Sequence, residues 1–180
     1  FEGRAITALP DFARARLGIV YTFQITSIFK NLTVHDNVAL AAQRRLTLQR
    51  SVLKLDQSEL RAASEAALDR VGLAERRHDI AATLAYGHQR LLEVAMTLAL
   101  QPKLLILDEP TQGLAADEIA AFCTLVRDIA AATTVLLIEH NMDVVMALAS
   151  RITVMSRGRV LAEGAPDAIR ADRDVQEAYL

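Results

Sequence analysis

Apolar runs alternate with helix-spaced segments through the second half of the chain. Residues 104–107 and 134–138 are short, mainly apolar runs, which is typical of strands covered on both faces. Residues 117–132 between them, and 141–149 after them, carry apolar side chains at helical spacing. This alternation predicts an α/β fold, in which a mostly parallel sheet has helices on its faces.

The two ends of the chain add further strand patterns. Residues 15–23 contain an apolar, β-branched run that predicts a strand leading to Gln24. Residues 151–164 predict a hairpin that turns near Gly158, followed by a helix opened by Pro166.

Residues 25–95 have mostly helical patterns and predict a lobe beside the sheet. Thr33 is suited to cap a short helix in which Asp36 complements the helix dipole. Residues 43–58 are polar and are expected to form an irregular surface excursion.

Two longer helices are predicted next. The first begins at the N-cap Asp56, carries an apolar stripe and ends at Gly72. The second runs from about His88 to Leu100 and is stopped by Pro102.

The composition, with 52% hydrophobic and 23% charged residues in a 180-residue chain, is that of one soluble globular domain. A net charge of −2 argues against a nucleic-acid-binding face. The single cysteine, Cys123, cannot form an internal disulfide and favours a reducing compartment. No apolar run approaches the roughly 18 residues that span a bilayer, and no signal peptide is visible.

The strongest chemical signal is the acidic pair Asp108-Glu109, directly after the run LLIL. In nucleotide hydrolases an acid at the end of such a strand holds Mg²⁺, and a second carboxylate can deprotonate the attacking water. The alternative is that the pair caps the next helix or faces solvent. Pro110-Thr111 and a turn at Gly113 favour the functional interpretation.

Two weaker signals point to the same chemistry. His140 follows the second buried strand, so it should emerge at the same carboxyl edge, where it can donate a hydrogen bond to a phosphate oxygen. Gly87 precedes a long helix, whose free N–H groups favour an anion. The alternatives are an incidental histidine and an ordinary helix start.

Taken in this order, the motifs resemble those of the nucleotide-binding subunit of an ABC transporter. Gln24 after YTF resembles the glutamine loop, LAYGHQ at 84–89 the LSGGQ signature, and LLILDEP the Walker B strand with its catalytic glutamate. Residues 112–117 correspond to the D-loop, and His140 to the switch histidine. The segments RARLGIVYTFQITSIFKNLTVHDNVALAAQ, EHNMDVVM and VQEAYL are most similar to the ATPases of branched-chain amino-acid importers.

The resemblance implies a partial P-loop NTPase (RecA-like) core with an ABC-type helical lobe. Residues 1–24 would be a remnant of the core that ends at the glutamine loop. Residues 25–95 would form the helical lobe and end in the signature motif. Residues 96–180 would supply the rest of the core, with Walker B, the D-loop, the switch histidine and a C-terminal hairpin with helices.

The resemblance also implies a site for ATP and Mg²⁺. Asp108 and Gln24 would contact the metal, Glu109 would be the general base, and His140 would contact the γ-phosphate. Two subunits would form a head-to-tail dimer around two ATP molecules, and the signature segment of each would cover the ATP of the other. The residues of that segment are Ala85, Tyr86, Gly87, His88 and Gln89.

The implied partners are a second ATPase subunit, identical or homologous, and transmembrane permease subunits. A periplasmic solute-binding protein would act indirectly, and no nucleic acid is implied. The chain would be peripheral, at the cytoplasmic face of the inner (plasma) membrane, and the choice of solute would lie in other subunits.

The phosphate-binding loop of the family is absent from the sequence. A Walker A loop reads G-x-x-x-x-G-K-[S/T], yet none of the three lysines follows a glycine, and no two of the seven glycines are five residues apart. The chain begins at Phe1, so we expect a family member that lacks its N-terminal part, and we expect the 180 residues alone to be inactive. Ala85 replaces the signature serine and Ala115 a D-loop aspartate, which weakens both motifs.

Two other functions stay open at this point. One is a catalytically inert fragment with at most an interaction role, and the other is an ABC ATPase that serves lipid or lipopolysaccharide export. A zinc enzyme is set aside because four histidines and one cysteine offer no ligand spacing.

Overall fold

The computed structural model describes residues 1–22, 27–49 and 56–179. The chain folds into two compact units, Phe1–Ile138 and Glu139–Leu180. The predicted division into a core remnant (1–24), a helical lobe (25–95) and the rest of the core (96–180) stays a prediction.

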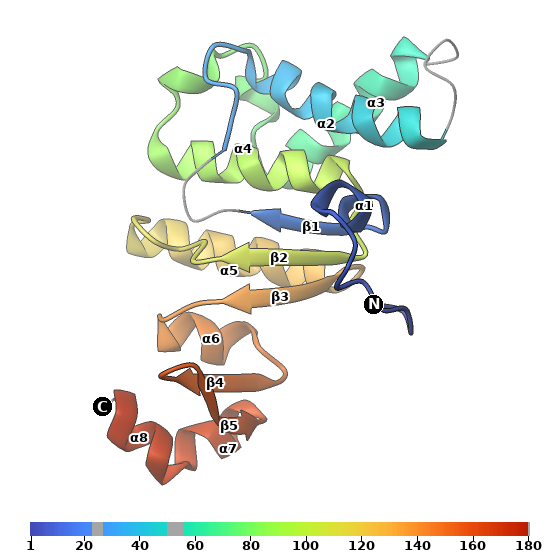
Figure 1. Cartoon of the computed structure of the whole chain (residues 1–180). Helices are drawn as coiled ribbons and strands as arrows, with labels where there is room; N and C mark the ends of the chain where they lie inside the picture. The colour runs from blue at the N-terminus through green and yellow to red at the C-terminus, as the bar shows by residue number, and fades with distance from the viewer. Residues whose placement is uncertain (23–26, 50–55, 180) are drawn as a thin grey trace. The chain divides into compact units, whose positions relative to one another are not determined.

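The first unit is built on a sheet of three parallel strands (Figure 1). In the order of the sheet they are β1 (Ile19–Thr22), β2 (Leu104–Asp108) and β3 (Thr134–Ile138). Tyr21, Ile106 and Leu136 stand side by side in the register of these strands. The parallel sheet predicted from the apolar runs is therefore confirmed.

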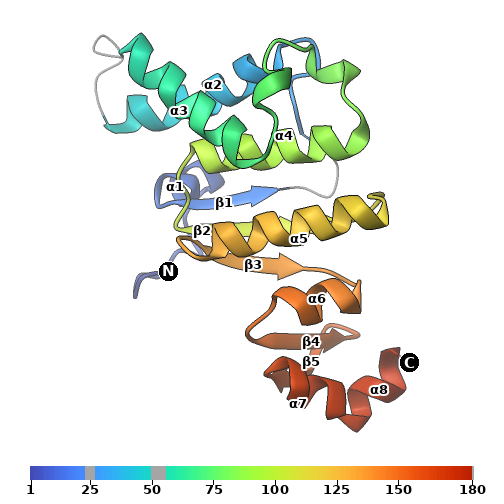
Figure 2. The same ribbon diagram turned by 180° about the vertical axis from the view of Figure 1, so that it is seen from behind.

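The two faces of this sheet are covered to different extents. Leu105 and Leu107 of β2 are fully buried, whereas Tyr21, Leu136 and Ile138 are 39%, 49% and 45% exposed. Because successive side chains of a strand point to opposite faces, one face packs against helices and the other is apolar and largely open. Helix α5 (Ala116–Ala130) lies along the strands on one face of the sheet (Figure 2) and buries Phe122, Cys123, Val126 and Ile129.

Three helices pack against one another beside β1 (Figure 1). They are α2 (Val34–Gln49), α3 (Gln57–Arg70) and α4 (Tyr86–Ala99). Two short 3₁₀ turns, η2 (Ala74–Arg76) and η3 (Ala81–Thr83), connect α3 to α4. Their core is apolar and includes Leu68 at 1% exposure and Leu92 and Ala95 at 0%.

Helix α2 is longer than the sequence pattern predicted. It continues to Gln49, so the surface excursion predicted for residues 43–58 is wrong over 43–49, and it is also wrong over 57–58, which belong to α3. Residues 50–55 lie outside the described residues. The apolar residues of α2 recur every four positions in a stripe, and the polar residues between them made this helical pattern hard to recognise in the sequence. The stripe consists of Val34, Val38, Ala42 and Leu46, all at most 2% exposed.

The strand predicted for residues 15–23 is shorter than expected. The first two residues of the predicted range belong instead to helix α1 (Asp11–Arg16). The chain then turns at Gly18, where φ is +94°. The φ favours glycine, and a Cβ at this position would make a tight contact of 3.2 Å with the backbone nitrogen of Lys103. β1 begins only at Ile19.

The helix boundaries predicted from single residues are mostly confirmed. Asp56 is the N-cap of α3 and accepts a hydrogen bond from the Ser58 N–H at 2.8 Å. Gly72, with φ +72°, follows the end of this helix. Helix α4 begins at Tyr86, two residues earlier than predicted, and ends before Pro102.

The second unit contains a hairpin and three helices. Its strands, β4 (Ile152–Ser156) and β5 (Arg159–Gly164), pair antiparallel and turn at Gly158, as predicted. Its helices are α6 (Met142–Leu148), α7 (Pro166–Ala171) and α8 (Arg173–Tyr179). A small core is formed by Ile152, Val154, Ile169 and Val175. In the described parts of both units, we found no helix with the length and apolar character needed to cross a membrane.

The start of α2 offers a test of helix capping. The Thr33 hydroxyl oxygen accepts a hydrogen bond from the Asp36 N–H at 3.0 Å. The pKa of Asp36 lies below its ordinary value, chiefly because the Thr33 hydroxyl hydrogen-bonds the carboxylate, and also because His35 is adjacent. Thr33→Ala is expected to lower the free energy of unfolding by about 1 kcal/mol at neutral pH, and to raise the pKa of Asp36.

The sign of the pH dependence follows from the lowered pKa of Asp36. The stabilisation by its carboxylate is complete above the pKa of the unfolded chain and is lost as the pH falls through the folded pKa. The difference between wild type and Thr33→Ala should therefore shrink in acid. Urea denaturation of both proteins at several pH values measures this difference in unfolding free energy. A difference that grows in acid would contradict the stabilising role of the Asp36 carboxylate.

Candidate functional site

The chain turns sharply directly after β2. Glu109 has φ +43°, in the left-handed region that residues other than glycine rarely adopt. Its N–H still donates to the Ile138 carbonyl oxygen at 2.8 Å, so the hydrogen bonds between β2 and β3 extend to this residue. Asp108 and Glu109 therefore lie at the carboxyl end of the sheet, where open α/β folds bind their ligands.

A tyrosine that sequence reasoning missed contacts the predicted metal ligand. The Tyr21 hydroxyl on β1 donates a hydrogen bond to Oδ2 of Asp108. This bond is the main reason why the pKa of Tyr21 is raised, because the carboxylate stabilises the protonated phenol. Tyr21 pairs with Ile106, two residues before Asp108 and on the same face of the sheet. Only the pairing of β1 with β2 reveals this contact, and local sequence patterns do not show that pairing.

A buried arginine on α4 contacts the same turn. Arg90 is 1% exposed, and its guanidinium donates to the carbonyl oxygens of Asp108, Glu109 and Pro110 at 2.9, 3.3 and 3.4 Å. It also forms a 2.7 Å ion pair with Glu93, which is buried as well. Sequence reasoning missed both residues. Two opposite charges three positions apart, within the mainly apolar part of the helix, are the signal that could have found them.

The segment predicted to cover a phosphate begins helix α4. Ala85 is the N-cap residue, and residues 86–89 form the first turn. The Gln89 side-chain amide donates to the Leu84 carbonyl oxygen at 2.9 Å, which fixes the entry of the chain into the helix. The five signature residues therefore lie together at the N-terminal end of one helix.

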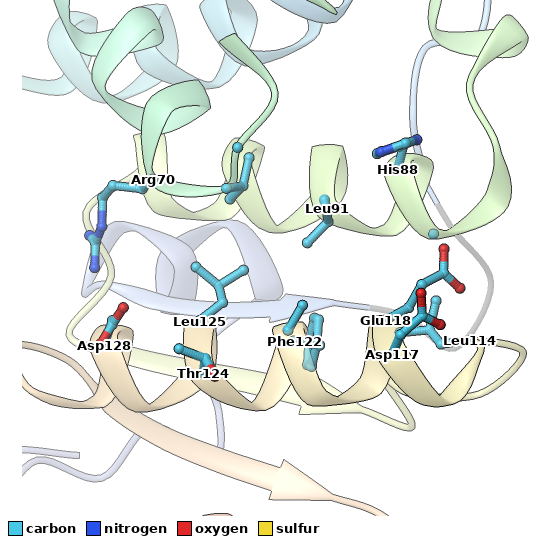
Figure 3. A pocket seen from close by; sticks show the side chains of 14 residues that line it. Arg70, His88, Leu91, Leu114, Asp117, Glu118, Phe122, Thr124, Leu125 and Asp128 are labelled. Carbon is cyan, nitrogen blue, oxygen red and sulfur yellow. The ribbon is translucent and has the colours of Figure 1, made fainter. Parts of the chain in front are cut away.

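A pocket of about 440 Å³ opens between α4 and α5 beside this segment (Figure 3). Leu91 points into it from α4, and Phe122 and Leu125 from α5 (Figure 3). At its edge the two helices approach closely, since a Cβ on Gly87 would lie 2.2 Å from Oε1 of Glu118. Glycine at position 87 therefore leaves room for the α5 carboxylate.

The two other predicted site residues are not placed beside the acidic pair. Gln24 lies outside the described residues. His140 belongs to the second unit, where its N–H donates to Oε2 of Glu139 at 3.1 Å. Its position near Glu109 stays a prediction.

The acidic pair fits a magnesium ion that is shared with phosphates. Within the described ranges, no three His, Cys, Asp or Glu side chains gather closely enough to hold a metal by themselves. In nucleotide sites, however, Mg²⁺ usually takes one or two carboxylates and completes its octahedron with phosphate oxygens and water. Asp108, half-buried at the strand end, has the carboxylate and the position that such a site needs.

A parallel sheet with an acidic pair at its carboxyl end is typical of α/β domains that hydrolyse nucleoside triphosphates. The comparison with protein families is more specific. The model of the ABC transporter family matches residues 1–112, and that of the branched-chain amino acid ATP-binding cassette transporter matches 159–180. The chain belongs to the ABC transporter family, as one of its ATP-binding proteins.

Individual relatives agree with this assignment. The chain is 41% identical over 185 residues to LivG of Escherichia coli (strain K12), a high-affinity branched-chain amino acid transport ATP-binding protein; the match covers 97% of the chain and 72% of LivG. The crystal structure of the ADP conformation of MJ1267, an ATP-binding cassette of an ABC transporter, superposes with a TM-score of 0.83 at 26% identity, covering 99% of this chain and 74% of that one.

A second structural neighbour is cbiO1 from Clostridium perfringens, which is part of the ABC transporter complex cbiONQ. It superposes with a TM-score of 0.78 at 26% identity and covers 92% of this chain and 64% of its own. These neighbours confirm the predicted fold class, an ABC-type P-loop NTPase domain with a parallel sheet, and the ATPase class of the chain.

Proposed function

We propose that this chain is the ATP-binding and ATP-hydrolysing subunit of an ABC importer for branched-chain amino acids or related small solutes. The observation that carries the proposal is the 41% identity to LivG over 97% of the chain. The match of residues 159–180 to the branched-chain amino acid model adds support, because it lies outside the residues matched by the general family model. Both observations favour import over lipid or lipopolysaccharide export.

In this proposal Glu109 accepts the proton of the water that attacks the γ-phosphate. Its main chain is held by the Ile138 carbonyl on one side and by Arg90 on the other, so a rigid strand end carries the carboxylate. General-base catalysis of this kind contributes roughly 10²–10⁴ in rate. His140 contacts the γ-phosphate, a role that rests on the family motif.

Asp108 and Gln24 are the proposed magnesium ligands. A bound Mg²⁺ supplies positive charge that neutralises the phosphate oxygens as the γ-phosphoryl group is transferred. The Tyr21 hydroxyl orients the Asp108 carboxylate from β1. The role of Gln24 rests on the family motif alone.

The N-terminal end of α4 is the proposed cover for the ATP bound to a second subunit. Free N–H groups and the positive end of the helix dipole favour an anion there. Ala85 lacks the hydroxyl of the family's signature serine, and a hydrogen bond to a charged group is worth about 1.5–3 kcal/mol. Gly87 keeps its backbone N–H, so this cover is weakened and not lost.

The proposed partners follow from the transporter families. A second ATPase subunit, identical or homologous, completes the two ATP sites. Transmembrane permease subunits use the movement of the dimer, and a periplasmic solute-binding protein delivers the solute. The membership of cbiO1 in a transporter complex supports assembly with other subunits. The proposed location is the cytoplasmic face of the inner membrane.

The 180 residues alone are expected to release phosphate from ATP only at the background rate. The sequence contains no Walker A loop, so the backbone N–H groups and the lysine that hold the β- and γ-phosphates are missing. The protein expressed from its complete reading frame is expected to turn over ATP with Mg²⁺. A phosphate-release assay on both proteins measures this.

Different results would contradict the expected inactivity of the 180 residues and the proposed function. Turnover by the 180-residue chain that is lost in its Glu109→Gln variant would contradict the first. Absence of turnover in the protein from the complete reading frame, purified with its permease partners, would contradict the proposed function. Uptake of labelled leucine that depends on this gene distinguishes an importer from an exporter.

A further inference from the structure

We propose that the buried pair Arg90–Glu93 fixes the backbone of Glu109 in the conformation needed for catalysis. The inference rests on the proposed function, in which Glu109 is the general base. Arg90 is then a positioning residue, because it acts on the main chain of the turn and does not touch the reacting groups.

The contacts of Arg90 depend on the unusual backbone of the turn. Successive carbonyl groups of a strand point in opposite directions, so three in a row do not reach one donor. Here the carbonyl oxygens of residues 108, 109 and 110 all accept from the Arg90 guanidinium. They converge because the chain turns at Glu109, where φ is +43°. Arg90 therefore recognises this backbone conformation and no extended one.

An arginine suits this task better than a lysine. The guanidinium is planar and carries five N–H donors in a fixed fork, whereas a lysine ammonium is a compact charge with three donors. Among the described residues, the acceptors of the Arg90 guanidinium are the three carbonyl oxygens and the Glu93 carboxylate, the last at 2.7 Å. The Arg90 and Glu93 side chains are 2% and 6% exposed, so little water is available to replace these partners.

Glu93 extends the network to a third segment of the chain. Its Oε2 pairs with Arg90, and its Oε1 accepts a hydrogen bond from the Ser27 N–H at 3.3 Å. Ser27 is the first described residue after the predicted glutamine loop at Gln24. The pair thus connects the backbone at residue 27, through α4, to the backbone at residue 109.

Stability alone does not require this pair. Replacing a buried ion pair with apolar residues of similar volume is often neutral or stabilising. Apolar side chains, however, offer no donors to the three carbonyl oxygens. The Glu109 carbonyl oxygen also accepts from the Gln112 N–H at 3.2 Å, a contact within the turn that does not fix the carbonyl groups of residues 108 and 110. Without Arg90 these two carbonyl groups lose a shared donor and the turn can relax towards extended backbone, which moves Glu109 away from the position it now occupies.

The test is the double variant Arg90→Met, Glu93→Leu in the protein expressed from its complete reading frame. The apolar pair keeps the volume and removes both charges together, so no buried charge is left unpaired. The variant is expected to fold, with a lower melting temperature than wild type because the three carbonyl oxygens and the Ser27 N–H lose their partners. Its kcat for ATP is expected to fall by about 10- to 100-fold, because small misplacements of catalytic groups cost up to about 10² in rate. The KM for ATP should change by less than about twofold.

A matched control is Arg61→Met, Glu65→Leu, which removes an exposed ion pair of α3 and should leave kcat unchanged. A folded Arg90→Met, Glu93→Leu variant with wild-type kcat would overturn the proposal. If that variant does not fold, Arg90→Lys keeps the charge and the ion pair but not the fork. A lower kcat at unchanged KM in Arg90→Lys supports the proposal, and wild-type kcat overturns it.

A crystal structure of a folded Arg90 variant gives a readout that needs no turnover. The proposal expects Glu109 to leave the left-handed region, and a retained positive φ overturns it. An inactive wild-type protein would count against the proposed function, while the backbone of Glu109 in the variant would still decide the role of Arg90.

Discussion

Replacing Glu109 with glutamine is expected to lower ATP turnover by roughly 10²–10⁴-fold, because an amide cannot accept the proton of the attacking water. The backbone of this residue is held by the Ile138 carbonyl and by Arg90, and neither contact involves the Glu109 side chain. The substitution should therefore change the chemistry of the side chain and leave the turn intact. Steady-state phosphate release by the protein from the complete reading frame measures the loss.

Nucleotide binding separates loss of chemistry from loss of structure in this variant. Binding of a fluorescent ATP analogue should be unchanged, because Glu109 is proposed to act on the water. The control is Glu75→Gln, an exposed carboxylate outside the site, which should keep wild-type turnover. If the Glu109 variant hydrolyses ATP within about twofold of wild type, general-base catalysis by this residue is wrong.

Sequence patterns predicted the elements of the fold best where one residue dictates the local backbone. The N-cap at Asp56 and the turns at Gly72 and Gly158 are confirmed. The apolar run before Asp108 became a central parallel strand. The pattern failed in the second half of α2, where polar residues outnumber the buried stripe, which packs in the core shared with α3 and α4.

The candidate site could be predicted only in part, because some of its residues are brought together by tertiary contacts. Asp108 and Glu109 were found because chemistry and strand end coincide in one short stretch of sequence. Tyr21 and Arg90 reach the same turn from β1 and α4, far away along the chain. Their roles depend on tertiary contacts, which periodicity and motif spacing do not encode. The left-handed backbone of Glu109 is likewise set by its hydrogen bonds and not by its residue type.

Replacing Leu107 with alanine is expected to lower the free energy of unfolding by about 2–5 kcal/mol. Leu107 is fully buried in the central strand, between Thr22 of β1 and Leu137 of β3. Truncation leaves a cavity that the two flanking strands and the helices cannot close without breaking their hydrogen bonds. Urea denaturation of the 180-residue chain, followed by circular dichroism, measures the loss.

Leu136→Ser, in the neighbouring strand, is the matched contrast. Leu136 is 49% exposed on the open face of the sheet, so the change should cost no more than about 0.5 kcal/mol, as is usual for surface positions.

Tyr21 and Ile138 are exposed on the same face of the sheet as Leu136, which makes this face an apolar surface that favours association. The 180-residue chain should therefore bind a hydrophobic dye and self-associate, and Leu136→Ser should reduce both. If Leu136→Ser destabilises the chain as much as Leu107→Ala, this face is covered in solution.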